Sequence, residues 1–163
     1  MLSKSQNTAP IRDKRLDEEI EYQLLILVHH KFMRLANQAL MSTLGITFSL
    51  GSAMLHLEQS PSVSFQGLAA FFGCGTGRIS RLVRDLESQG LVSTWRAHLD
   101  KRAVQLVLTP AGRQLVLRIP AVLRQAEQQM LRNLTGNERE KLQVVIAGMV
   151  ARFDQTRKTT SRI

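Results

Sequence analysis

The sequence has 163 residues, about the length of one domain, and with 44% hydrophobic and 21% charged residues it is neither disordered nor of low complexity. Its 22 Lys and Arg residues outnumber its 13 Asp and Glu residues and give a net charge of +9, which favours nucleic acid, or less often an anionic membrane surface, as a partner. The single cysteine, Cys74, excludes an internal disulfide. Because the apolar runs 24–28 and 144–151 are too short to span a membrane and the first fifteen residues lack the apolar core of a signal peptide, we expect a cytoplasmic protein without a membrane partner.

Residues 1–12 are polar and predict a flexible tail, whereas residues 13–44 have the spacing of a long helix. Its apolar residues recur at steps of three and four, namely at Leu16, Ile20, Leu24, Leu27, Val28, Phe32, Leu35 and Ala39. The stretch Leu24–Val28 is apolar on all sides, so we expect one face to pack on the chain's own core and another on a partner. Gly45 then ends this helix, and Thr47 is suited to cap the next one.

The following segment predicts two helices joined by a tight turn. Ser64 is a good N-cap for a short helix over Phe65–Phe72, which Gly73 breaks. A second helix is expected over Gly75–Gln89, with Gly90 just past its end. The residues suited to form the core between the two helices are Leu68, Ala69, Phe72, Ile79 and Leu82. Their spacing is typical of a helix-turn-helix.

A β-hairpin and two more helices complete the chain. The segments Leu91–Trp95 and Ala103–Leu108 have strand-like composition and flank a polar tip, which predicts a hairpin with a long loop. Thr109 caps another helix, which Pro120 is expected to interrupt and kink. A capping box then starts the last helix, at Thr135-Gly136-Asn137-Glu138. The apolar stripe of this helix consists of Leu142, Val145, Ile146, Met149, Val150 and Phe153. Because the terminal helices are long and apolar for so small a chain, we expect them to form a dimer interface.

The helix over Gly75–Gln89 separates its apolar and basic residues onto two faces. The apolar face consists of Ile79, Leu82, Val83 and Leu86, spaced at i, i+3, i+4 and i+7. The opposite face carries Gly77, Ser80, Arg81 and Arg84, with Arg78 beside it. A guanidinium group can bind guanine edges or phosphates through two hydrogen bonds, and a helix fits the width of the major groove. The pattern therefore predicts contact with DNA, although three arginines can also form an ordinary solvated face.

The hairpin tip is positively charged at Arg96, Lys101 and Arg102. An arginine at the tip of a β-hairpin can enter the minor groove, where the negative potential is enhanced. Asp100 lies two residues before Arg102 and is suited to orient it through a charge-assisted hydrogen bond. A plain charge pair within the hairpin is the alternative.

Six short motifs follow one another between Gly45 and Gly112. They are Gly45-Ile46-Thr47, Leu68-Ala69-Ala70-Phe71-Phe72-Gly73, Arg78-Ile79-Ser80-Arg81-Leu82-Val83, Leu86-Glu87-Ser88-Gln89-Gly90-Leu91-Val92, Asp100-Lys101-Arg102-Ala103 and Leu108-Thr109-Pro110-Ala111-Gly112. This combination resembles the MarR family of winged helix-turn-helix transcription regulators. The resemblance implies a mainly α fold with a small β wing. It places a DNA-binding region at 45–109 between dimerisation helices at 13–44 and 110–163.

The resemblance further implies a homodimer that represses transcription from a pseudo-palindromic operator in double-stranded DNA. The recognition helix would enter the major groove and the wing the adjacent minor groove. Carried over by position, the DNA-binding residues are Gly75, Thr76, Gly77, Arg78, Ser80, Arg81, Arg84, Arg96, Asp100, Lys101 and Arg102. Members of the family also bind small aromatic or anionic molecules, so release by such an effector is expected by resemblance. The sequence departs from the family at Gly75 and Gly77, where Ser, Thr or Pro is usual, and base specificity therefore cannot be carried over.

Two other functions stay open at this point. One is a winged-helix module that binds proteins and not DNA, which the two departing glycines favour and the arginine face disfavours. The other is a redox-sensing regulator acting through Cys74, a residue that we otherwise expect to be a small buried thiol.

The sequence contains no catalytic triad, phosphate-binding loop, carboxylate pair or zinc-ligand spacing, so we expect no enzymatic activity, cofactor or metal. His29 and His30 are adjacent on a predicted helix and point about 100° apart, which disfavours shared metal ligation. Three methionines are expected in the core, namely Met33, Met41 and Met54.

Overall fold

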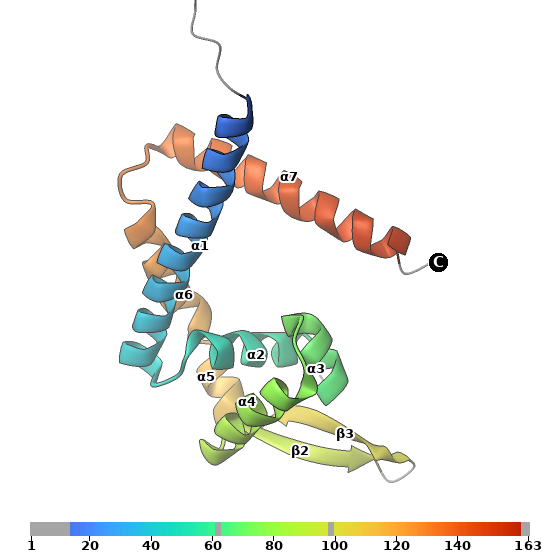
Figure 1. The fold of residues 1–163 in the computed structure, drawn as a ribbon. Helices are drawn as coiled ribbons and strands as arrows, with labels where there is room; N and C mark the ends of the chain where they lie inside the picture. The colour runs from blue at the N-terminus through green and yellow to red at the C-terminus, as the bar shows by residue number, and fades with distance from the viewer. Residues whose placement is uncertain (1–13, 61–62, 98–99, 161–163) are drawn as a thin grey trace, which may run out of the picture.

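The structure, a computed structural model, describes residues 14–60, 63–97 and 100–160, with the side chains of residues 23–60, 63–95 and 104–152. It is mainly α-helical with one small sheet, as the sequence predicts (Figure 1). In chain order the elements are α1 (Lys14–Leu44), α2 (Phe48–Gln59), β1 (Val63–Ser64), α3 (Phe65–Phe72), α4 (Thr76–Ser88), β2 (Val92–Ala97), β3 (Asp100–Leu108), α5 (Pro110–Val116), α6 (Ile119–Met130) and α7 (Gly136–Thr160).

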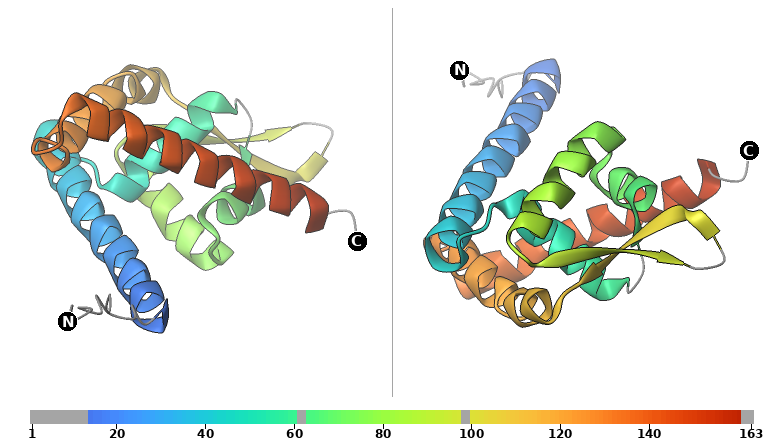
Figure 2. Two further views of the ribbon diagram at one scale, coloured as in Figure 1. Left: turned by 90° about the horizontal axis from the view of Figure 1, so that it is seen from above. Right: turned by 90° about the horizontal axis from the view of Figure 1, so that it is seen from below.

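The elements form a helical part and a sheet-bearing part. Helices α1 and α6 pack side by side, and α2 leads from the end of α1 to the pair α3 and α4 (Figure 1). The three-stranded antiparallel sheet, in the order β1-β3-β2, lies beyond α4. Helix α7 extends away from the end of α6, as the views in Figure 2 also show. The helix-turn-helix and hairpin are thus carried at one end of the molecule by the helical part.

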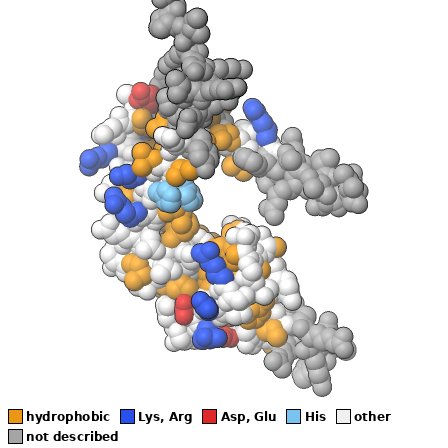
Figure 3. Space-filling view, viewed as in Figure 1, with side chains coloured by type: hydrophobic (Ala, Val, Ile, Leu, Met, Phe, Trp, Pro, Cys, Tyr) orange, Lys and Arg blue, Asp and Glu red, His pale blue; other side chains and the backbone are white. Residues whose placement is uncertain are grey.

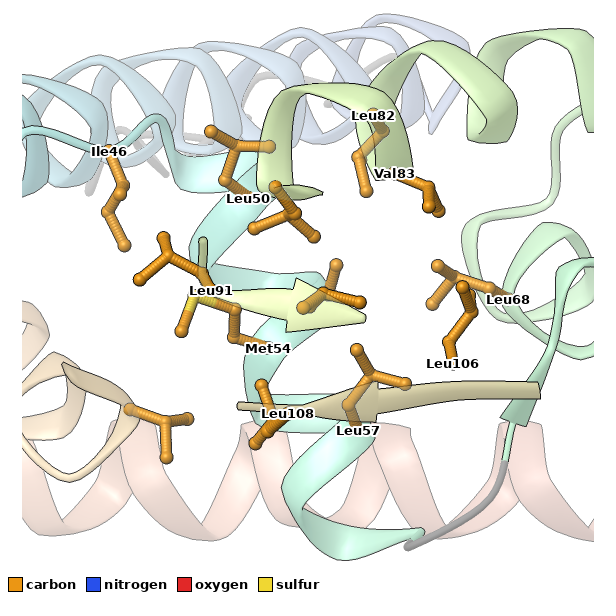
Figure 4. Packing of buried hydrophobic residues seen from close by; sticks show 14 of the residues in the cluster. Ile46, Leu50, Met54, Leu57, Leu68, Leu82, Val83, Leu91, Leu106 and Leu108 are labelled. Carbon is orange, nitrogen blue, oxygen red and sulfur yellow. The ribbon is translucent and has the colours of Figure 1, made fainter. Parts of the chain in front are cut away.

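The hydrophobic core lies where α2, α3, α4 and the sheet meet (Figure 4). Its side chains come from α2, α3, α4 and all three strands of the sheet. They include Leu50, Met54, Leu57, Leu68, Leu82, Val83, Leu91, Leu106 and Leu108. Among the residues whose burial is described, no charged or polar side chain is buried. Each large apolar side chain buried in such a core stabilises the fold by about 1.5–3 kcal/mol. This packing fixes which side of α4 faces inward.

The predicted helix ends are confirmed by their caps. The hydroxyl groups of Thr47 and Ser64 accept hydrogen bonds from backbone N–H groups three residues on, at 3.3 and 3.0 Å, and so begin α2 and α3. Gly73 and Gly90 have φ angles of 60° and 67°. This left-handed conformation favours glycine, and it turns the chain sharply after α3 and α4.

The predicted capping box at the start of α7 is also present. The backbone N–H of Thr135 donates to Glu138 Oε2 at 2.8 Å, and the N–H of Glu138 donates to Thr135 Oγ1 at 3.4 Å. The hydrogen bonds from the backbone and the hydroxyl group of Thr135 lower the pKa of the Glu138 carboxyl. Arg139, the next residue, donates from Nη2 to the carbonyl oxygen of Leu131 at 2.8 Å. These bonds hold the connection between α6 and α7.

The hairpin is longer than predicted, because its strands continue into the charged tip. Strand pairing uses backbone groups only, and polar side chains can point to water from either face of a hairpin. The register shifts near the tip, since Arg96 pairs with Val104 but Ala97 pairs with Asp100. The two-residue strand β1 is a further difference. It is too short to produce an alternating pattern, and it was therefore not predicted.

The predicted interruption near Pro120 is confirmed, because α5 and α6 are separate helices, but the predicted kink is wrong, because Pro120 lies in the first turn of α6. Helix α5 ends at Val116, and α6 starts at Ile119 with Pro120 in its first turn. Proline lacks a backbone N–H, and its ring clashes with the carbonyl group four residues earlier, here that of Val116. A proline in the first helical turn avoids both penalties.

Two expectations for α1 are wrong within the single chain. The residues of Leu24–Val28 are each 39–58% exposed, so none of their faces packs on the chain's own core. Among residues 23–44 of α1, the buried ones are Ala36 and Leu40. Met41 is exposed and Met33 half-buried, whereas Met54 is buried as predicted. Helical spacing alone could not distinguish a core-facing surface from one left for a partner.

Helix α5 begins in close contact with the chain that follows α4. The Thr109 hydroxyl donates to the carbonyl oxygen of Gly90 at 2.7 Å and accepts from the N–H of Gly112 at 3.0 Å. A Cβ at Gly112 would collide with the carbonyl oxygen of Leu91. Glycine is therefore required at this position by packing.

We expect Gly112→Ala to destabilise the protein by about 1–3 kcal/mol, because α5 must shift away from the Leu91 backbone to admit a methyl group. The measurement is urea unfolding followed by circular dichroism. Gly136→Ala is the control, since a Cβ at Gly136 meets no atom within 4 Å. An unchanged unfolding midpoint for Gly112→Ala would show that the contact is not restrictive.

Candidate nucleic-acid interface

The side chains of α4 divide between core and solvent as the sequence predicts. The four apolar residues of this helix are buried, namely Ile79, Leu82, Val83 and Leu86. The candidate DNA-binding residues of the helix and its N-cap are all exposed, namely Gly75, Thr76, Gly77, Arg78, Ser80, Arg81 and Arg84. The core therefore holds α4 with its arginine-bearing face toward solvent.

The guanidinium groups of Arg78, Arg81 and Arg84 are not used by the fold. Within the described residues, none of them makes a hydrogen bond or an ion pair. Arg and Lys side chains gather over α4 in the space-filling view, with acidic side chains beside them (Figure 3). The acidic residues on this helix, Asp85 and Glu87, come only in its second half. Exposed guanidinium groups without internal partners can bind an anionic ligand without first breaking a contact.

The turn between α3 and α4 has the geometry expected of a helix-turn-helix. Gly73 adopts the left-handed conformation, and the N–H of Cys74 donates to the carbonyl oxygen of Ala69 at 3.1 Å. Ala69 is buried, and its small side chain allows α3 and α4 to approach each other. Cys74 packs against the core as expected of a small apolar thiol, but it is half-buried and not buried.

Two residues at the start of α4, Gly75 and Gly77, have no side chain. The N-cap residue, Gly75, has no side chain that could accept a capping hydrogen bond. The hydroxyl group of Ser80 donates to the carbonyl oxygen of Thr76 at 3.0 Å and is therefore folded back onto the helix. The arginines consequently extend further from the helix axis than any other candidate side chain on this face.

The candidate residues of the wing lie on strands and not in a loop. Arg96 belongs to β2, and Asp100, Lys101 and Arg102 belong to β3. The backbone thus brings all four to the end of the hairpin remote from α5. Their side chains lie outside the described part, so the expected pairing of Asp100 with Arg102 stays a prediction.

Two residues that the sequence analysis did not identify, Asn37 and Arg113, connect neighbouring elements through hydrogen bonds to the backbone. The N–H of Phe48, at the start of α2, donates to Asn37 Oδ1 on α1 at 2.9 Å. Arg113 on α5 donates from Nη1 to the carbonyl oxygen of Leu108 on β3 at 2.9 Å. Neither contact has a sequence signature, because each joins a polar side chain to a backbone group that only the fold brings near.

Two apolar surfaces on the terminal helices are not covered by the chain. One is Leu24–Val28 on α1. The other lies on α7, where Val144, Val145, Ile146, Met149 and Val150 are 41–67% exposed. Exposed apolar clusters of this kind mark interaction sites in soluble proteins.

In the described ranges, no three His, Cys, Asp or Glu residues lie close enough together to hold a metal ion. The rings of His29 and His30 lie 5.8 Å apart. No single helix in this part of the chain is long and apolar enough to cross a membrane. Only a bent pair, residues 23–44 of α1 with α2 at 80°, has the required length and composition together.

Comparisons with known proteins agree with this geometry. No family model matches the sequence. The HTH-type transcriptional repressor Rv2887 of Mycobacterium tuberculosis is 30% identical over 103 residues, which cover 63% of this chain and 74% of that protein. The apo crystal structure of MarR from Escherichia coli matches with a TM-score of 0.72 at 23% identity and covers 78% of this chain and 94% of MarR. A mutant of the same MarR complexed with operator DNA matches with a TM-score of 0.67 at 24% identity, over 78% of this chain and 91% of that one.

The division of α4 into two faces predicts that mutation of its exposed arginines hardly changes stability, whereas mutation of a buried residue lowers it. We expect alanine at Arg78, Arg81 or Arg84 to change the free energy of unfolding by no more than about 0.5 kcal/mol, because these side chains are exposed. Leu86→Ala should cost about 2–5 kcal/mol, since Leu86 is completely buried. Chemical denaturation measures both. A large loss of stability for the arginine variants would show that these residues are structural.

Proposed function

This chain belongs to the MarR family of winged helix-turn-helix transcriptional regulators, and on that premise we propose that it represses transcription by binding a pseudo-palindromic DNA operator as a homodimer. The observation that carries the proposal is the face of α4 that bears Arg78, Arg81 and Arg84, which is exposed and unused by the fold. The proposed function has no enzymatic step.

The arginines supply the chemistry that duplex DNA requires. Contacts to phosphates give affinity and depend steeply on salt, whereas hydrogen bonds to base edges give specificity. Arg81 and Arg84 lie on the side of α4 opposite its buried face, so in our proposal they recognise bases in the major groove. Arg78 lies beside them and binds the phosphate backbone. The complex of the similar MarR mutant with operator DNA supports DNA binding as the function, by analogy of fold.

The wing contributes through its tip in the same proposal. Arg96, Lys101 and Arg102 enter or border the minor groove, and Asp100 orients Arg102. The course of β2 and β3 supports this part, because it carries these residues to the end of the hairpin. Minor-groove contacts follow groove width more than base sequence.

A second copy of the chain is the proposed partner for the apolar surfaces of α1 and α7. Between α6 and α7 lies a groove of about 550 Å³, whose lining is mixed: Leu131, Leu142, Ile146 and Ala147 are apolar, whereas Arg124, Glu127, Gln128, Arg139 and Gln143 are polar or charged. A partner helix with an apolar face, such as α1 at Leu24–Val28, has the chemistry to fill it. The dimer then presents two α4 helices to half-sites whose centres lie about 10 base pairs apart.

We also propose that a small effector acts by changing the distance between the two α4 helices. The hydrogen bond from Phe48 to Asn37 supports this, because it joins the start of α2 to a helix of the proposed dimer interface. A ligand that prefers a differently spaced dimer would lower the affinity for the operator.

The test begins with selection of an operator from a random duplex library by the wild-type protein. We expect the observed affinity to fall steeply as salt rises. Arg81→Ala and Arg84→Ala should each reduce discrimination between the operator and its point variants by about 1–3 kcal/mol. Arg102→Ala should weaken binding with less change in sequence preference.

Arg132→Ala is the control, since Arg132 is exposed between α6 and α7, removed from α4, and its loss changes the net charge equally. Unchanged operator affinity in all three variants would contradict the proposal. Absence of any salt-dependent duplex binding would instead favour the protein-interaction module.

The dimer is tested by charge substitution on the exposed apolar surfaces. We expect Leu25→Lys and Val145→Lys to produce folded monomers in sedimentation experiments, because both residues are 58% exposed in the single chain and a lysine there stays hydrated until a partner covers it. Leu117→Lys, at a site 73% exposed between α5 and α6, should remain dimeric. A wild-type monomer, or a dimer unaffected by either substitution, would refute the proposed interface.

A further inference from the structure

Gly77 lies at the centre of the α4 face that the proposed function places against DNA. At 3.6 residues per turn, Gly77 falls within about 40° of both Arg81 and Arg84 around the helix axis. The buried residues Ile79 and Leu82 lie on the other side of the helix. When this face enters a groove, the backbone at Gly77 is therefore among the first parts of α4 to reach the base pairs.

Within the part of the chain that the structure describes, nothing requires glycine at this position. Its φ angle is negative, unlike those of Gly73 and Gly90. A Cβ at Gly77 would meet no atom within 4 Å, whereas one at Gly112 would collide with backbone. Glycine in a helix loses more conformational entropy on folding than alanine, so Gly77 weakens α4 without any internal benefit.

A glycine that neither conformation nor packing explains can serve close approach of the backbone to a ligand. We infer that Gly77 is a specificity-determining residue, at which the absence of a side chain lets the first turn of α4 contact base edges on the floor of the major groove. The inference rests on the proposed function and adds to it. The arginines bind DNA with their long side chains, whereas Gly77, which has no side chain, lets the backbone of α4 approach the bases.

The arrangement of the neighbouring side chains fits this role. The Ser80 hydroxyl is folded back onto the carbonyl oxygen of Thr76, so it does not hold the helix away from a bound surface. The guanidinium groups of Arg81 and Arg84 are on longer side chains and can reach past the backbone contact at Gly77 to either side. A methyl group at Gly77 would separate α4 from the bases and lengthen the contacts of both arginines.

The inference predicts that Gly77→Ala stabilises the protein yet weakens specific binding. The melting temperature should rise by up to about 4 °C, because alanine is the better helix former. Affinity for the operator selected by the wild-type protein should fall about tenfold or more. Affinity for an unrelated duplex should stay within about twofold, because that binding depends on phosphate contacts.

A second variant separates direct contact from stiffening of the helix. Valine is bulkier than alanine but a poorer helix former, so contact predicts a larger loss of operator affinity for Gly77→Val than for Gly77→Ala. Stiffening predicts the reverse order. Gly136→Ala is the matched control, since Gly136 also lies in the first turn of a helix with open space around it, and it should leave operator affinity unchanged.

The outcomes distinguish failure of the proposed function from failure of the role assigned to Gly77. If the wild-type chain selects no operator, the proposed function is wrong and the role of Gly77 falls with it. If the wild-type chain binds an operator and Gly77→Ala binds it equally well, or if alanine is more harmful than valine, the role of Gly77 alone is overturned.

Discussion

The packing of one side of α4 against the core is the constraint on which the rest of the molecule depends. Four apolar side chains of this helix are buried, at about 1.5–3 kcal/mol each, and no interaction of its polar side chains competes with that energy. Because a helix is a rigid rod with a fixed period, burial of Ile79, Leu82, Val83 and Leu86 determines that Gly77, Arg81 and Arg84 face outward. The exposed face therefore follows from the apolar one, without any structural contribution from the arginines themselves.

A few polar contacts then connect this helix to the helical part of the molecule. The hydroxyl group of Thr109 bonds the end of α4 to the start of α5, and Gly112 allows the close approach at Leu91. The bond between Phe48 and Asn37 makes a similar connection from α2 to α1. Each joins a side chain to the backbone and restrains direction as well as distance. In a dimer built on the terminal helices, these contacts would convert the geometry of the interface into the spacing of the two α4 helices.

Local chemistry in the sequence was enough to predict much of this fold. The caps at Thr47, Ser64 and Thr135 and the left-handed glycines after α3 and α4 act over three or four residues, so they can be recognised without knowledge of the fold. The two faces of α4 were predictable for the same reason.

Features that depend on distant parts of the chain could not be predicted in this way. The strand β1 exists only because β3 pairs with it, and the contact of Asn37 with the Phe48 backbone depends on the way α2 meets α1. Exposure of Leu24–Val28 was missed because an apolar helix has the same pattern whether its own chain or a partner covers it. Gly77 was recognised as a departure from the family pattern. Only the fold shows that a Cβ at this position would meet no atom within 4 Å.

The central claim is that the two α4 helices of a dimer, one from each subunit, insert their exposed faces into the major groove at two successive turns of duplex DNA. The most direct measurement is protection of guanine N7, a major-groove atom, from methylation by dimethyl sulfate when the protein binds its operator. The account predicts two protected patches with centres about 10 base pairs apart, both of which disappear with the double variant Arg81→Ala, Arg84→Ala. Tight binding to the operator without any protection of guanine N7, or with the same protection in the double variant, would contradict it.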